Sequence, residues 1–186
     1  RFQRNNLLKN RLSNKYADQM IVALDQQLID YGSRIAIYRY KYSFMLASFA
    51  KVFHEILSSK QETLNITYEN NFSNNMSSLD IIKQEYSDVL RENRKREFEQ
   101  FTSLFGPHKD DLKISINDLD TRVYASQGQQ RTAMLALKLA EAKLIEKLTQ
   151  VKPILLLDDV FSELDNQRSR LLVEAIKGYQ TIITTN

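Results

Sequence analysis

The sequence predicts an α/β fold, in which helices cover a sheet, combined with a long helical arm. Three observations predict it. A continuous apolar run, Ile154–Leu157, lies between Pro153 and two acids, which is typical of a strand buried on both faces of a parallel sheet. A helical run precedes it over Thr132–Leu148. Apolar residues at heptad spacing indicate a much longer helix over residues 17–57.

Composition limits the class of protein. A chain of 186 residues can bury a core and hold one or two domains. The absence of cysteine suits a reducing compartment, so a cytoplasmic location is expected. No apolar run is long enough to span a bilayer, and no membrane association is expected. The net charge is only +3, so any contact with nucleic acid must come from a local cluster of basic residues.

The first element is a short helical segment over about residues 4–12, interrupted near residues 13–15. The long helix that follows carries apolar residues in steps of three and four for more than four heptads. We expect these residues to be core, with stacking on single-stranded bases as the alternative for the aromatic ones. They are Leu24, Leu28, Tyr31, Ile35, Tyr38, Tyr42, Met45, Phe49, Val52 and Ile56.

A return helix is predicted over about residues 78–104, after a strand with period-two alternation over 63–68. The return helix contains a basic run that acids interrupt. A solvated helix face is the simpler interpretation, and contact with DNA phosphates is the more specific alternative. The basic residues are Arg91, Arg94, Lys95 and Arg96.

The segment Gly106–Asp111 is predicted to be a turn that leads into a strand over 112–116 and a hairpin at Asn117–Asp118. Its function is open: a capped turn, or a turn whose His108 or Lys109 reaches a nucleotide or a neighbouring subunit. The other histidine, His54, has no companion ligand nearby in the sequence, so no metal role is expected for it.

A helix opens at Ser126-Gln127-Gly128-Gln129-Gln130. The first N–H groups of a helix have no internal partners, and the helix dipole attracts an anion to them. Gly128 would let the backbone approach such a ligand closely. The alternative is that Ser126 only caps the helix and Gly128 only eases the turn.

Two adjacent acids, Asp158 and Asp159, follow the apolar strand. They fall at its carboxyl end, where open α/β sheets bind their ligands. A magnesium ion that carries nucleotide phosphates is the usual partner of such an acid, and a helix cap or a solubilised loop is the alternative. Ser162 and Asp165 follow, and each is a candidate helix cap.

Together these motifs resemble the signature motif (Ser126–Gln130), the Walker B strand (Ile154–Asp158) and the D-loop (Ser162–Asp165) of ABC-type ATPases, in order and spacing. Within that superfamily, Gly106-Pro107-His108-Lys109-Asp110-Asp111-Leu112, Ala125–Thr132 and Leu155–Asp165 are similar to the RecF family of DNA-repair and recombination mediators. The opening Arg1–Leu8 resembles the start of that family's arm. The compact arm is unlike the long coiled coils and hinge of SMC proteins.

The resemblance implies the carboxy-terminal half of an ABC-type ATPase lobe, residues 105–186, with an inserted coiled-coil-like arm, residues 1–104. It implies that Ser126, Gln127, Gly128, Gln129 and Gln130 bind the γ-phosphate of ATP held by a second subunit. Asp158 would hold Mg²⁺, Asp159 would be catalytic, and Ser162 and Asp165 would form the D-loop at the dimer interface. Thr185 occupies the switch position.

By the same resemblance, the function is that of an ATP-dependent DNA-binding mediator. It would dimerise on ATP and act at double-stranded or gapped DNA with RecR, and indirectly with RecO and RecA. A non-catalytic helical interaction module is the alternative, and a fragment of another SMC-like ATPase is a third reading. The sequence has four glycines and no phosphate-cradling G-x-x-x-x-G-K-[ST] loop, so we expect an internal fragment that is inactive alone, with an unpaired strand edge at residues 154–157.

Two departures from the ABC pattern predict slow hydrolysis in the full-length dimer. Asp159 stands where these ATPases usually carry Glu, and Asp is one methylene shorter, so its reach toward an attacking water is reduced. Thr184-Thr185 stands where a switch His is usual. A threonine can donate a hydrogen bond to phosphate but cannot carry its charge.

Overall fold

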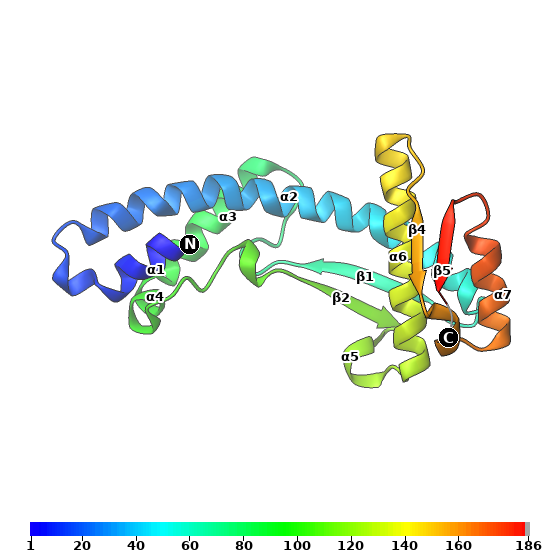
Figure 1. The fold of residues 1–186 in the computed structure, drawn as a ribbon. Helices are drawn as coiled ribbons and strands as arrows, with labels where there is room; N and C mark the ends of the chain where they lie inside the picture. Colours follow the sequence, from blue (N-terminus) through cyan, green and yellow to red (C-terminus); the bar gives the residue numbers. More distant parts are fainter. Residues whose placement is uncertain (185–186) are drawn as a thin grey trace. The chain divides into compact units, whose positions relative to one another are not determined.

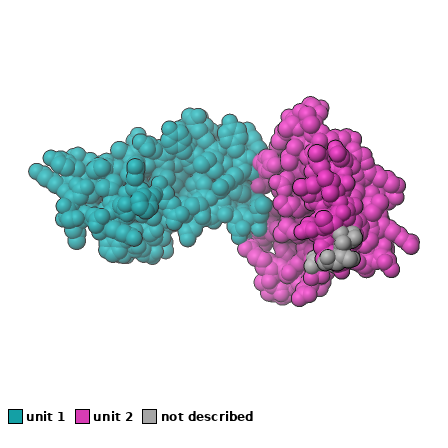
Figure 2. All heavy atoms as spheres, in the orientation of Figure 1, with its two compact units in different colours: residues 1–41, 68–112 teal, residues 42–67, 113–186 magenta. Residues whose placement is uncertain are grey.

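The computed structural model describes residues 1–184, and at residue 163 it describes the backbone alone. The chain divides into two compact units, which Figure 2 distinguishes by colour. Unit 1 comprises residues 1–41 and 68–112, and unit 2 comprises residues 42–67 and 113–186. The long helix and two strands contribute residues to both units.

Helices and strands alternate in the mixed α/β order that the sequence predicts (Figure 1). Two hydrogen-bonded sheets form, β1-β2-β3 and β4-β5. The helices are α1 (Phe2–Lys9), α2 (Ala17–Leu57), α3 (Leu79–Glu92), α4 (Arg94–Gln100), α5 (Thr121–Tyr124), α6 (Gln127–Thr149) and α7 (Asn166–Ala175), with single 3-10 turns η1 (Arg11–Ser13), η2 (Pro107–Lys109) and η3 (Val160–Glu163). The strands are β1 (Leu64–Glu69), β2 (Asp111–Ile116), β3 (Leu119–Asp120), β4 (Leu155–Asp158) and β5 (Thr181–Thr184).

The core of unit 1 forms where α3 lies against α2. The buried stripe of α3 repeats every four residues, at Ile82, Tyr86 and Leu90, as a helix that buries one face requires. Tyr86 stacks on Phe72, with ring centroids 4.0 Å apart. Gly32 of α2 lies so close to Tyr86 that a Cβ atom there would approach its ring carbon to 2.8 Å. The absence of a side chain at this position therefore allows the close packing of the two helices.

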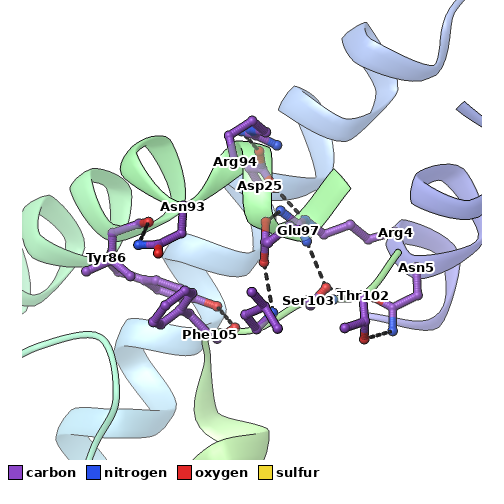
Figure 3. Close-up of polar contacts among 12 residues, drawn as sticks. Arg4, Asn5, Asp25, Tyr86, Asn93, Arg94, Glu97, Thr102, Ser103 and Phe105 are labelled. Carbon is purple, nitrogen blue, oxygen red and sulfur yellow. Dashed lines mark hydrogen bonds and ion pairs between the residues drawn. The ribbon is translucent and has the colours of Figure 1, made fainter. Parts of the chain in front are cut away.

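A buried ion cluster ties α1 into unit 1 (Figure 3). The Arg4 guanidinium is fully buried and donates hydrogen bonds to the carboxylates of Asp25, at 2.6 Å, and Glu97, and to the Ser103 hydroxyl at 2.8 Å. Asp25 also accepts from Arg94, and the second oxygen of Glu97 accepts from the backbone N–H of residue 104 at 2.9 Å. Every charge in the cluster is therefore paired, which a buried charge requires.

Unit 2 is built around α6. Small residues on two faces of this helix let it pack closely. Ala136 and Ala142, together with Leu139, join one apolar cluster with Leu155 of β4 and Leu172 of α7. A second apolar cluster contains Ala133 and Ala140 of α6, Ala50 of α2, and Leu64 and Ile116 of the first sheet. Because α6 lies in both clusters, its position in unit 2 is fixed from two sides.

The strand β4 pairs in parallel with β5, with Asp158 beside Thr184. The predicted burial of β4 on both faces is wrong for the part of the chain that the structure describes. Leu155 is buried, but Ile154 and Leu156 on the alternate face are 56% and 73% exposed. Leu155 packs against α6 and α7, whereas the described residues leave the side chains of Ile154 and Leu156 uncovered.

The long helix α2 has the predicted bounds, but the burial predicted for its heptad positions is wrong for six of the ten. Leu28 and Phe49 pack against apolar clusters as predicted. Tyr31 and Tyr38 are 64% and 72% exposed, and Ile35 is also exposed. The buried face instead carries small residues, among them Ala36 and Ala50. In unit 1, α2 approaches Tyr86 closely, and this requires small residues such as Gly32 and Ala36 on the buried face of α2. The buried face therefore does not coincide with the stripe of large apolar residues at the heptad positions.

Several other predictions about single elements are refined. The predicted return helix is two helices, α3 and α4, because α3 ends at Asn93, whose side-chain amide donates to the Val89 carbonyl at 3.0 Å. The first helix ends three residues before the predicted position, at Lys9. The hairpin at Asn117–Asp118 is confirmed, since both residues have the positive φ of a type I′ turn, 50° and 65°.

The predicted boundary between an arm at 1–104 and an ATPase lobe at 105–186 stays a prediction, while the compact units of the structure divide α2 itself. Among residues 1–184, no helix combines the length and the apolar character that crossing a bilayer demands.

Candidate functional site

The amino end of α6 is closed by a capping box. The Ser126 hydroxyl oxygen accepts a hydrogen bond from the Gln129 backbone N–H at 3.2 Å. In return the Gln129 side-chain oxygen accepts from the Ser126 backbone N–H at 2.9 Å. Ser126 is exposed, and its hydroxyl uses only its oxygen in the cap. The hydroxyl proton therefore remains available for an acceptor such as a phosphate oxygen.

The rest of the predicted signature motif lies on the first turn of α6. Gln127 and Gln130 are exposed, and the Gln130 side chain donates to the Thr121 carbonyl at 3.1 Å. Gly128 faces α7: a Cβ atom there would lie 3.2 Å from a guanidinium nitrogen of Arg168. Gly128 thus lets the Arg168 side chain approach the helix end closely.

The acid pair stands at the carboxyl end of β4. The Thr184 hydroxyl donates a hydrogen bond to Asp158 and accepts one from the Asp159 backbone N–H at 3.1 Å. Asp159 has the left-handed backbone conformation, with φ 49° and ψ 26°. Asp tolerates this conformation better than most residues do, which is a local reason for Asp rather than Glu at this position.

The predicted D-loop residues have separate local roles. The Asp165 carboxylate caps α7 by accepting from the Arg168 backbone N–H at 2.8 Å. Ser162 instead donates its hydroxyl proton to the Asp159 carbonyl at 2.8 Å. The Arg168 guanidinium lies 3.7 Å from Asp165 and beside Gly128, so it connects the two motifs. Thr185, the predicted switch residue, lies outside the described residues.

A groove of about 610 Å³ lies between α6 and β4. Its walls include Arg131 and Lys138 of α6, Leu156 of β4 and the preceding Ile154, and it also includes the acid pair Asp158 and Asp159. Figure 1 shows the amino end of α6 and the carboxyl end of β4 at the same end of unit 2. The unit therefore presents a helix end and an acid pair on one side.

The acid pair fits a magnesium ion delivered with a nucleotide better than a metal held by protein alone. Asp158 is exposed and its orientation is fixed by the Thr184 hydroxyl. Within residues 1–184 no three His, Cys, Asp or Glu side chains gather as a metal site. An ion bound at Asp158 would accordingly take most of its ligands from phosphates and water, as Mg²⁺ commonly does.

The predicted basic run lies in unit 1 and divides in two. Arg94 points inward and pairs with Asp25, whereas Arg91, Lys95 and Arg96 are exposed. The Gly106–Asp111 turn also lies in unit 1. Its Asp110 carboxylate is nearly buried and accepts from the Tyr68 hydroxyl at 2.5 Å and from Arg39 at 3.0 Å, so this acid anchors the turn.

Sequence reasoning missed two residues that the structure brings to the motifs, Glu62 and Arg168, and it missed the contact of Thr184 with the acid pair. The Gln129 side-chain amide donates to Glu62 at 2.9 Å. The aligned ends of two parallel strands could have indicated the contact of Thr184, and the spacing of three from the cap Asp165 could have indicated Arg168. No sequence signal indicates Glu62, which follows α2 and lies 67 residues from Gln129.

Behind Glu62 lies His54 of α2, which is fully buried. Its Nε2 atom is 3.6 Å from the second Glu62 oxygen. Burial lowers the pKa of His54 below its usual value, with the field of Glu62 acting in the opposite direction. His54 is thus expected to be neutral at neutral pH.

Replacing His54 with Gln should reduce the loss of stability on mild acidification. The unfolded chain takes up the histidine proton near its ordinary pKa, whereas the folded chain does so only at lower pH. Stability is therefore fully present above about pH 6.5 and falls as the pH drops below it. Urea unfolding at about pH 7.5 and about pH 5.5 should show a smaller difference for His54→Gln than for wild type. His108, whose pKa is also lowered by burial, keeps its own contribution, so an unchanged difference would contradict the assignment to His54.

Comparison with known proteins matches this chain to RecF proteins both in sequence and in structure. The chain is 45% identical over 185 residues to the DNA replication and repair protein RecF of Streptococcus gordonii, covering 98% of this chain and 50% of that protein. It is 42% identical over 182 residues to RecF of a Thermoanaerobacter species, covering 97% of this chain and 49% of that protein. Over nearly its whole length, this chain is similar to half of a RecF protein. No family model matches the sequence.

The fold of this chain is also similar to that of a solved RecF structure. A solved structure described as the recombination mediator protein RecF with ATP in the RecFOR pathway superposes with a TM-score of 0.87 and 35% identity. The match covers 99% of this chain and 49% of that chain. The chain therefore spans about half the length of the RecF proteins that it matches.

Proposed function

We propose that the full-length protein is an ATP-dependent, DNA-binding mediator of recombination and repair. The observation that carries the proposal is the pairing, within unit 2, of a capped helix end at Ser126 with an acid pair at the end of β4. Similarity to RecF proteins supports it, since a RecF structure of 35% identity is described with ATP.

In this proposal two copies share each nucleotide. Ser126 donates its free hydroxyl proton to the γ-phosphate of the ATP held by the other copy, and the N–H groups from Gln127 to Gln130 add the positive end of the α6 dipole. Asp158 of that other copy orients the Mg²⁺ that accompanies the ATP. Ser162 and Asp165 line the interface. Thr185 takes the switch position.

The enzyme activity in this proposal is slow ATP hydrolysis by the full-length dimer. Asp159 acts on the attacking water, but its short side chain and left-handed backbone limit its reach. ATP then acts more as a switch for dimerisation than as a source of energy. The 186 residues alone lack a phosphate loop, so we expect no turnover from them.

The proposed partners are double-stranded or gapped DNA and RecR, with RecO and RecA acting downstream in the cytoplasm. The name of the RecFOR pathway, given to the family structure, supports RecR and RecO as partners. The exposed residues Arg91, Lys95 and Arg96 are the candidate phosphate contacts. Arg94 is withdrawn from that candidate set, because it pairs with Asp25 inside unit 1.

The second candidate is a non-catalytic interaction module. The exposed aromatic residues of α2, including Tyr31 and Tyr38, favour it, because exposed apolar surface is typical of interaction sites. ATP-dependent behaviour of the full-length protein would distinguish the two functions.

Replacing Asp159 with Asn should abolish hydrolysis while leaving ATP-dependent dimerisation in place. Asn tolerates the left-handed backbone but cannot accept a proton, and general-base catalysis contributes roughly a hundredfold or more to rate. The measurement is phosphate release by the full-length protein, with sedimentation velocity on the same samples. Asp80→Asn, in the exposed first turn of α3, is the matched control.

Wild-type hydrolysis by Asp159→Asn would contradict the catalytic assignment. The longer Asp159→Glu variant tests the explanation for slow turnover, which requires it to hydrolyse ATP faster than wild type.

A further inference from the structure

The side chain of Gln129 makes two hydrogen bonds with opposite ends of its amide. Its oxygen accepts from the Ser126 backbone N–H at 2.9 Å, and its nitrogen donates to a Glu62 oxygen at 2.9 Å. The second bond defines which end of the amide faces which partner, since a carboxylate can only accept. If the amide reversed, its NH₂ group would face the Ser126 N–H and the cap would be lost.

Glu62 thus determines the geometry of the capping box without belonging to it. With the Gln129 oxygen held on the Ser126 N–H, the Ser126 hydroxyl oxygen remains on the Gln129 N–H at 3.2 Å. The hydroxyl proton is then directed away from the cap.

The other side of Glu62 lies against His54, which is fully buried. The second Glu62 oxygen is 3.6 Å from the His54 Nε2 atom. The Glu62 carboxylate therefore contacts Gln129 through one oxygen and lies beside a buried imidazole through the other.

We propose that Glu62 is a positioning residue for the nucleotide-facing end of α6, with His54 packed behind it. Glu62 fixes the Gln129 amide, the amide fixes the Ser126 backbone, and the Ser126 hydroxyl proton is thereby presented to an anion. The inference rests on the proposed function for its ligand, a nucleoside triphosphate. The positioning itself is a property of unit 2 and is measurable without nucleotide.

Hydrogen–deuterium exchange of the full-length protein without nucleotide tests the positioning. Glu62→Ala should raise exchange about fivefold in peptides covering residues 125–132, as expected when a hydrogen bond worth about 1 kcal/mol is lost. Glu62→Gln should stay near wild type, because its side-chain oxygen can still accept from Gln129. Glu141→Ala is the control, since Glu141 is an exposed acid of the same helix, paired with Lys138 at 3.1 Å.

ATP-dependent dimerisation by sedimentation is the second measurement. Glu62→Ala should raise the ATP concentration needed about tenfold, while Glu62→Gln and Glu141→Ala should not change it. A merely structural role predicts a lower unfolding midpoint for Glu62→Ala with unchanged ATP dependence.

The two proposals fail separately. Unchanged exchange in Glu62→Ala would overturn the positioning role whatever the nucleotide does. Raised exchange without any ATP-dependent dimerisation, even in wild type, would leave the positioning intact and overturn the proposed function. Equal loss in Glu62→Ala and Glu62→Gln would also overturn the inference, because it would mean that the charge and not the acceptor matters.

Discussion

Replacing Arg4 with Ala is expected to lower the free energy of unfolding by about 3–5 kcal/mol, the range measured when one partner of a buried ion pair is removed. The Arg4 side chain is fully buried and pairs with Asp25 and Glu97. Without it Glu97, itself fully buried, keeps only the backbone N–H of residue 104. The first helix α1 would also lose its main polar anchor. Urea unfolding followed by circular dichroism measures the change.

Two further variants test the cause. Arg11→Ala removes an arginine from an exposed pair with Asp18, 2.5 Å away, and should change stability little, because water screens that pair. Arg4→Met combined with Glu97→Gln should be more stable than Arg4→Met alone, because it removes the orphaned charge. A loss as small as that of Arg11→Ala would show that the cluster does not hold unit 1 together.

Replacing Ser126 with Arg is expected to abolish ATP-dependent dimerisation of the full-length protein. The larger cationic side chain would occupy the space that the γ-phosphate needs, and the substitution would remove the hydroxyl proton donor. It would also remove the N-cap of α6, which is worth about 1 kcal/mol. Sedimentation velocity with and without ATP measures the effect.

The control for this substitution is Ser48→Arg. Ser48 is an exposed residue of α2 whose hydroxyl bonds only to its own helix, at the Phe44 carbonyl. It should dimerise as wild type does. Thermal unfolding of both variants separates a lost cap from a lost phosphate contact, since a cap alone cannot account for complete loss of dimerisation. Wild-type dimerisation by Ser126→Arg would contradict the role assigned to Ser126.

The sequence predicted best the elements that local chemistry defines. The Ser126 cap of α6 and the Asp165 cap of α7, both offered as alternatives, and the Asn117–Asp118 hairpin each depend on residues only a few positions apart. The bounds of α2 were predicted as well, because a helix of 41 residues gives many repeats of its apolar period.

Contacts between distant residues could not be predicted in the same way. The inward face of α2 is decided partly at Gly32, which meets Tyr86 and Pro107 from much later in the chain. The apolar period shows that α2 has an apolar stripe but not which face is covered. Arg4 resembles a solvated helix residue in the sequence, because its partners Asp25 and Glu97 are distant. The hydrogen bond between Gln129 and Glu62 likewise joins residues that are far apart in the sequence.

The central claim is that Ser126 of one copy and Asp158 of the other serve the same nucleotide, and mixing two inactive variants tests it most directly. Full-length Ser126→Arg and Asp158→Asn proteins should each fail to dimerise with ATP when alone. Mixed in equal amounts, they should recover ATP-dependent dimers in sedimentation velocity, because a mixed pair contains one site with both residues intact. If the mixture stays as monomeric as its components, the two residues do not act across a shared nucleotide, and the account is wrong.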